Sequence, residues 1–176
     1  ARRAHETVLE HAPRHSHQSV GEVENASKRL KGQVRCEMAK VEHHYPMDPV
    51  SGQHELLPWA VRHSADVLTK YAKHSNGRTS WEMLRHKPYR GHVACFGESV
   101  WFKDPKKTGM DALNSQWGSG LWLGKIASSD EDLIGTASGV IAARTIRRKP
   151  PSQRWDEAEY REFTATPWTA SGTRTD

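Results

Sequence analysis

The chain has 176 residues, of which 35% are hydrophobic, and its formal net charge is +5 at pH 7. This length suits one domain of ordinary size or two small ones, and a mean hydropathy of −0.82 allows only a modest core. The positive charge favours a polyanionic partner over an acidic protein. No apolar run approaches the ~20 residues that span a bilayer, so no membrane partner is expected.

Two cysteines, Cys36 and Cys95, lie far apart and neither belongs to a CxxC pair. This spacing argues against a zinc knuckle and against a disulfide framework, and it favours reduced thiols inside a cell. The first residue is Ala1 rather than Met, which indicates a fragment of a longer protein.

The N-terminal segment 5–11 is short and β-branched at its centre, so we predict a strand there. The following loop carries His11, His15 and His17. We interpret these histidines as a polar loop rather than as zinc ligands, because no second Cys or His cluster has the spacing to complete a tetrahedral site.

A long helix is predicted over residues 19–44, ending before Pro46, which disfavours helix at the residue preceding it. At ~100° per residue its apolar positions fall within one sector and predict a core-facing stripe. The stripe consists of Val20, Val23, Leu30, Val34, Met38 and Val41.

Beside that stripe, Glu24 heads a lengthwise row formed with Lys28, Lys31 and Arg35. The spacing alone leaves two interpretations open. Glu24 is either an exposed acid whose basic neighbours add a few tenths of a kcal/mol of helix stability, or a metal-binding carboxylate next to cations that hold phosphates.

A second amphipathic helix is predicted over residues 57–72, with Pro58 in its first turn. We expect Trp59 to anchor the hydrophobic seam rather than to stack on a base. Thr79 and Glu82 have the spacing of a capping box and predict a short third helix that ends at Lys87-Pro88.

From Gly91 onward, short aromatic or β-branched runs alternate with Gly and Ser, which predicts strands at 99–103, 121–126, 132–136 and 140–147. The tightest hairpin is expected at 137–139, within a small antiparallel barrel. Its basic rim, which contains Arg144, Arg147 and Arg148, would bind a phosphate backbone; a solvated edge strand protected by charge is the alternative. Residues 151–176 have the composition of a flexible tail.

Several segments together resemble a known family. The loop, Gly21, Glu24, Lys28 and Lys31 resemble the third acidic position of a retroviral or retrotransposon integrase. Five later segments, in the same order, resemble the Pol polyprotein of copia-like LTR retrotransposons: LLPWAVRHSADVLTKYAK, GRTSWEMLRHKPY, FGESVWFKDP, WGSGLWLGK and DLIGTASGVIAARTIRR. The similarity covers nearly the whole chain.

The resemblance implies an α+β chain in which residues 1–90 form the C-terminal part of an RNase H-like catalytic core and residues 91–150 form an SH3-like β-barrel. It implies DNA integration by polynucleotidyl transfer, with Glu24 as a catalytic ligand of Mg²⁺ or Mn²⁺. The family's two aspartates should precede this glutamate, and no Asp occurs before Asp48. We therefore expect no catalysis and no retained metal from this chain alone.

The expected partner is DNA, both element ends and target, bound by Lys28, Lys31, Arg35, Arg144, Arg147 and Arg148. A homo-oligomer and a nuclear location are further implications of the resemblance. Two alternatives stay open: a non-catalytic module that binds nucleic acid or chromatin, and an inactive remnant of a retroelement.

Overall fold

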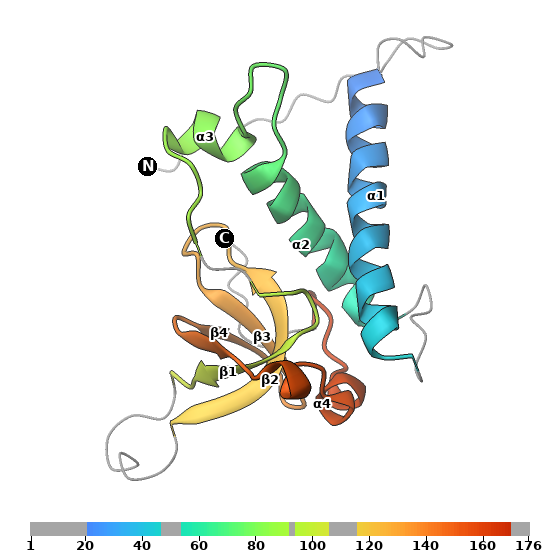
Figure 1. The fold of residues 1–176 in the computed structure, drawn as a ribbon, viewed down its shortest axis with the longest axis vertical. Helices are drawn as coiled ribbons and strands as arrows, with labels where there is room; N and C mark the ends of the chain where they lie inside the picture. Colours follow the sequence, from blue (N-terminus) through green and yellow to red (C-terminus); the bar gives the residue numbers. More distant parts are fainter. Residues whose placement is uncertain (1–20, 47–53, 92–93, 106–115, 170–176) are drawn as a thin grey trace.

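The computed structural model describes residues 21–46, 54–91, 94–105 and 116–169. These residues form a helical layer beside an antiparallel sheet (Figure 1), so the α+β class predicted from the sequence is confirmed. The strand expected at 5–11 and the histidine loop that follows it lie outside the described residues.

The first two helices, α1 (Gly21–His44) and α2 (Leu56–Tyr71), form where the apolar spacing predicts them. They run in opposite directions and pack together near the end of α1 (Figure 1). At 1.5 Å per residue, the 24 residues of α1 exceed the 16 of α2 by ~12 Å. The beginning of α1 therefore extends past its partner.

The predicted core-facing stripe of α1 is only partly confirmed. Met38 and Val41 are buried and Val34 packs against the core, but Leu30 is half-buried and Val23 is 67% exposed. The expectation was wrong for Val23 because this residue lies on the projecting end of α1, where residues 21–29 are all exposed.

The third helix, α3 (Ser80–Arg85), begins with the predicted capping box. The backbone N–H of Glu82 donates to Thr79 Oγ1 at 3.1 Å, and the backbone N–H of Thr79 donates to Glu82 Oε2 at 2.8 Å. His86 then adopts a left-handed conformation with φ of 57° and ends the helix before Lys87-Pro88.

Five antiparallel strands form one sheet in the order β4-β3-β2-β1-β5. Their bounds are β1 (Ser99–Lys103), β2 (Trp117–Lys125), β3 (Asp132–Thr136), β4 (Gly139–Ala143) and β5 (Ile146–Arg148). Strands β1 and β3 have the predicted bounds, and the β3–β4 hairpin turns where it was expected. Strand β2 begins four residues earlier than predicted, and the single strand expected at 140–147 is divided in two.

The break between β4 and β5 shows that the sheet is curled. These strands are its opposite edges, yet only Arg144 and Thr145 separate them in the chain. In a flat sheet, four spacings of ~4.8 Å would hold the edges ~19 Å apart. The chain from Ala143 to Ile146 spans at most ~11 Å, so the edges must approach each other at this corner.

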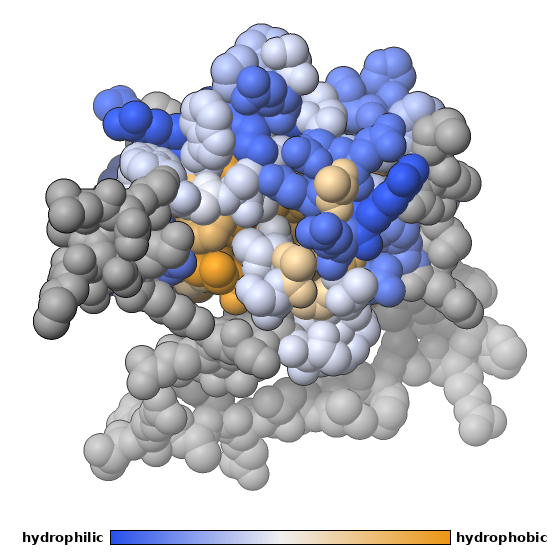
Figure 2. Space-filling view, turned by 90° about the horizontal axis from the view of Figure 1, so that it is seen from below, coloured by the Kyte–Doolittle hydropathy of each residue, from blue (hydrophilic) through white to orange (hydrophobic). Residues whose placement is uncertain are grey.

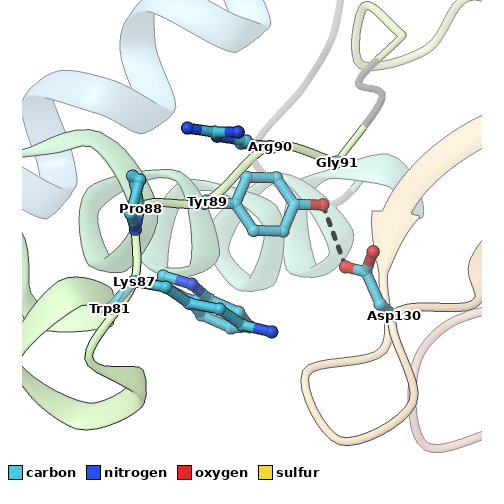
Figure 3. Close-up of a pocket in the computed structure, with 7 residues that line it drawn as sticks. All are labelled: Trp81, Lys87, Pro88, Tyr89, Arg90, Gly91 and Asp130. Carbon is cyan, nitrogen blue, oxygen red and sulfur yellow. Dashed lines mark hydrogen bonds between the residues drawn. The ribbon is translucent and has the colours of Figure 1, made fainter.

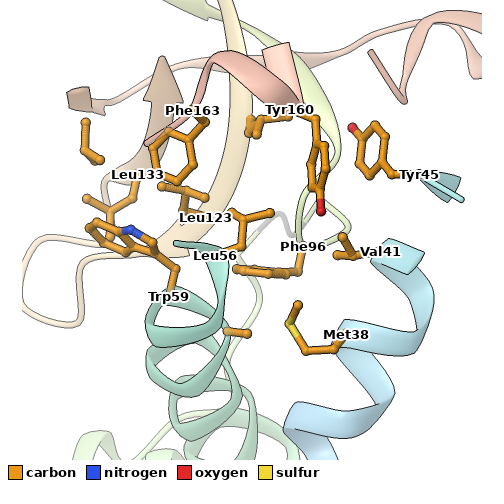
Figure 4. Close-up of a cluster of buried hydrophobic side chains, with 13 residues drawn as sticks. Met38, Val41, Tyr45, Leu56, Trp59, Phe96, Leu123, Leu133, Tyr160 and Phe163 are labelled. Carbon is orange, nitrogen blue, oxygen red and sulfur yellow. The ribbon is translucent and has the colours of Figure 1, made fainter. Parts of the chain in front are cut away.

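The two faces of the curled sheet support two apolar clusters. The smaller cluster lies on the face of Val100, Phe102, Trp122 and Ile134. The larger joins the opposite face to the helices (Figure 4). It consists of Met38, Val41, Tyr45, Leu56, Trp59, Ala60, Phe96, Leu121, Leu123, Leu133, Val140, Tyr160 and Phe163. The segments before and after residue 90, which we expected to form separate units, therefore share this core.

The segment after Pro150 is part of the fold as far as residue 169, which corrects the expectation of a flexible tail. It contains the 3-10 turn η3 (Pro151–Gln153) and the helix α4 (Glu157–Glu162), whose start is capped by Asp156. Tyr160 and Phe163 are each 2% exposed. Two aromatic side chains in the larger cluster outweigh the polar composition of the segment around them. Residues 170–176 lie outside the described part.

Trp59 holds this segment to α2. Its side chain is fully buried, and its indole N–H donates to the carbonyl oxygen of Ala165 at 2.8 Å. The prediction that Trp59 is an aromatic anchor is confirmed.

Candidate nucleic-acid interface

The basic row on α1 is exposed. It begins on the projecting end with Glu24 and Lys28 and continues beyond that end to Lys31 and Arg35. Glu24, Lys28, Lys31 and Arg35 all face solvent. None of the three cations forms a salt bridge with a described residue. Three positive charges along one edge of a helix, free of acidic partners among the described residues, can contact successive phosphates of a nucleic acid.

The three arginines predicted at the rim of the sheet have three different environments. Arg148 is bound to Glu98: its Nε donates to Oε1 at 2.7 Å and its Nη2 donates to Oε2 at 2.6 Å. Arg144 is 89% exposed and its Nε lies 3.1 Å from Glu131 Oε1. The guanidinium of Arg147 lies 4.8 Å from the ring centroid of Trp117.

The Glu98 carboxylate is fully buried, so its charge has to be balanced within the protein. Burial alone would raise the pKa of Glu98. Hydrogen bonds from Arg148 and from the backbone N–H of Cys95, together with the charges of Arg148 and Arg154, hold this pKa below its usual value. Arg148 thus has a structural role as the partner of Glu98, and its contact with DNA stays a prediction.

Arg147 belongs to an exposed part of the sheet that sequence reasoning missed. Trp101 lies opposite Ser119 on one side and Arg147 on the other, while Lys103 lies opposite Trp117. These residues share one face, because alternate positions of a strand point the same way. A shallow pocket of about 420 Å³ is lined by Trp101, Trp117, Gly118, Ser119 and Arg147. The alternation of Trp101 and Lys103 in a predicted strand was the available signal.

A second pocket, of about 500 Å³, lies beside α3 and the turn between β2 and β3 (Figure 3). Tyr89 Oη donates to Asp130 Oδ1 at 2.9 Å, and burial, followed by this contact with Asp130, raises the pKa of Tyr89. Lys70 Nζ lies 4.3 Å from the Tyr89 ring centroid, 2.8 Å from Asp66 Oδ2 and 3.5 Å from Asp130 Oδ1. These contacts join α2 to the sheet, so we interpret this pocket as part of a structural junction.

Seen from below, most of the described surface is hydrophilic, and a small apolar area is visible among the described residues (Figure 2). Within the described residues, no helix is long and apolar enough to cross a membrane.

The described part of the chain does not bring together three or more His, Cys, Asp or Glu side chains that could hold a metal ion. Glu24 is a single exposed carboxylate. Mg²⁺ needs several oxygen ligands in near-octahedral order, so the described residues do not by themselves fit the metal site that the integrase resemblance implies.

Comparisons of the chain with known protein families, with curated proteins and with solved structures found no match.

Proposed function

We propose that this chain binds DNA through the phosphate backbone, as the part of a copia-like integrase that follows the two catalytic aspartates. The single observation that carries DNA binding is the exposed row Lys28, Lys31 and Arg35 along α1, which begins on the projecting end of the helix. A helix that extends beyond its packing partner can approach a duplex without a steric obstacle from α2. Contacts of this kind position a nucleic acid without reading its sequence.

The integrase assignment rests on the ordered sequence resemblance, with partial support from the fold. An RNase H-like remnant would supply α1 and α2, and an SH3-like barrel would supply the sheet, whose edges approach closure between Ala143 and Ile146. In the longer protein Glu24 would be one oxygen ligand of Mg²⁺ or Mn²⁺, with the upstream aspartates as the others. The described chain contributes binding and orientation of DNA. Assembly into a homo-oligomer and a nuclear location belong to the same proposal.

The test is the salt dependence of binding to a labelled duplex, measured by fluorescence anisotropy. Each phosphate contact contributes a slope of about 0.9 to the plot of log affinity against log salt. Replacing Lys28, Lys31 and Arg35 together with Ala should therefore flatten the slope by up to ~2.7. Arg147→Gln should flatten it by ~0.9.

A charge-matched control replaces Lys73, Arg78 and Lys87 with Ala, since these three cations are also exposed but lie after α2 and around α3. This control should leave the slope nearly unchanged. If it flattens the slope as much as the α1 triple variant does, net charge accounts for binding and the α1 row has no special role. If the unmodified protein shows no salt-dependent binding to the duplex, the proposed function is wrong.

A further inference from the structure

One exposed face of the sheet has a composition that core packing does not explain. We call it the tryptophan face, and it is formed by Trp101, Lys103, Trp117, Ser119 and Arg147. Trp101 is 38% exposed, whereas its neighbours Val100 and Phe102 are 0% and 3% exposed. Those two neighbours fill the smaller apolar cluster on the other side of the sheet. The alternation of β1 therefore places the Trp101 indole on the opposite face of the sheet, where it is partly exposed to solvent.

The two tryptophans of this face lie on neighbouring strands and are offset by one side-chain position. Ser119 is directly opposite Trp101, and Trp117 comes two residues before it on the same strand. Diagonal neighbours of this kind are ~7–8 Å apart, which allows two separate ring platforms on one surface. Arg147 reaches over the Trp117 ring from β5, at 4.8 Å from the ring centroid.

The charges around these rings are positive. Lys103 and Arg147 are both exposed on this face. The nearby carboxylate of Glu159 is already engaged: it accepts hydrogen bonds from Ser99 and Ser119, and Lys149 Nζ lies 3.1 Å from its Oε1. An anionic ligand with flat rings complements such a surface, because stacking uses the indoles and the phosphates use the cations.

We propose that the tryptophan face binds single-stranded nucleic acid, with unpaired bases stacked on Trp101 and Trp117 and the backbone phosphates held by Lys103 and Arg147. The inference rests on the proposed function and adds a second site to it, specific for unpaired strands. Every base has a π face, so this binding tolerates any sequence. DNA and RNA share the base and phosphate chemistry that the face recognises.

The test compares three labelled probes by anisotropy with the full chain: a 15-nucleotide oligo-dT, an oligo-rU of equal length and a blunt duplex. Loss of one stacking platform weakens single-strand binding by about 5- to 150-fold. Trp101→Ala and Trp117→Ala should each show a loss in this range on oligo-dT, and Trp101→Phe should retain most of the affinity. The duplex affinity of Trp101→Ala should stay within about twofold of the unmodified protein. Equal losses on oligo-rU would show that the sugar is not distinguished.

The matched control is Trp168→Ala, which removes an indole that is 74% exposed and lies outside the tryptophan face. Unfolding in urea and near-ultraviolet circular dichroism confirm that each variant is folded. If Trp101→Ala does not fold, Trp117→Ala on the neighbouring strand tests the face. The inference is overturned if Trp168→Ala weakens oligo-dT binding as much as Trp101→Ala does. It is also overturned if a proline-rich peptide binds the face and oligo-dT does not.

The two proposals fail separately. Duplex binding without oligo-dT binding would refute the single-strand site and leave the α1 row in place. If the α1 triple variant still binds oligo-dT and the unmodified protein does not bind the duplex, the proposed function is refuted and the tryptophan face is retained.

Discussion

Arg147 and Arg148 are adjacent in β5, and the structure predicts opposite consequences when each is replaced with Ala. Arg148→Ala leaves the Glu98 carboxylate buried without its bidentate partner. Removing one member of a buried ion pair costs about 3–5 kcal/mol. The expected loss lies at the lower end, about 3 kcal/mol, because Arg148 is itself 43% exposed and Arg154 Nε remains 3.5 Å from Glu98 Oε1.

Arg147→Ala removes an exposed side chain that stacks on Trp117, so its stability should change by no more than about 0.5 kcal/mol. Equilibrium unfolding in urea measures both variants, with equal m-values required for the comparison. Adding Glu98→Gln to Arg148→Ala should recover about 1 kcal/mol or more, because the amide keeps the shape of the carboxylate and removes its charge. The reasoning is refuted if Arg148→Ala and Arg147→Ala lose the same small amount of stability.

The pH dependence provides a second check on the same pair. The folded-state pKa of Glu98 lies below its ordinary value of 4.5, so the stability it contributes is complete above pH 4.5 and is lost as the pH falls through the folded-state pKa. The stability difference between the unmodified protein and Arg148→Ala should therefore shrink on acidification below pH 4.5.

Two further predictions concern the core. His63 is buried between the rings of Phe96 and Trp122, and burial lowers its pKa, an effect modified by Glu37, Asp66, Lys40 and Lys70 from α1 and α2. The contribution of neutral His63 to stability is complete above pH 6.5 and decreases as the pH falls from there toward the folded-state pKa. The urea midpoint of the unmodified protein should fall over this pH window. The midpoint of His63→Phe should fall less. Phe163→Ala should cost about 3–5 kcal/mol because the ring is buried in the larger cluster. Trp168→Ala is its exposed control, and similar urea midpoints for these two variants would show that the segment after Pro150 does not contribute to the core.

Sequence patterns alone determined most of the local structure. Helical periodicity located α1 and α2, the Thr79–Glu82 spacing specified the cap of α3, and β-branched runs placed β1 and β3 with their bounds. These features depend on residues a few positions apart, so they are visible in a linear sequence. The helical wheel placed the α1 cations beside the apolar stripe, so the sequence pattern alone did not determine their exposure.

Long-range contacts decided the remainder. Strand alternation places Arg147 and Arg148 on opposite faces, but no local signal shows that Arg148 is held by a carboxylate 50 positions away or that Arg147 stacks on Trp117. The polar composition after Pro150 concealed Tyr160 and Phe163, whose burial depends on a surface built by α1, α2 and the sheet. Val23 fits the apolar stripe but is exposed in the described part of the chain, because the relative lengths of α1 and α2 determine where helix packing ends. A residue's type and spacing show what it can do, while its burial and its charge partners are set by segments distant in the chain.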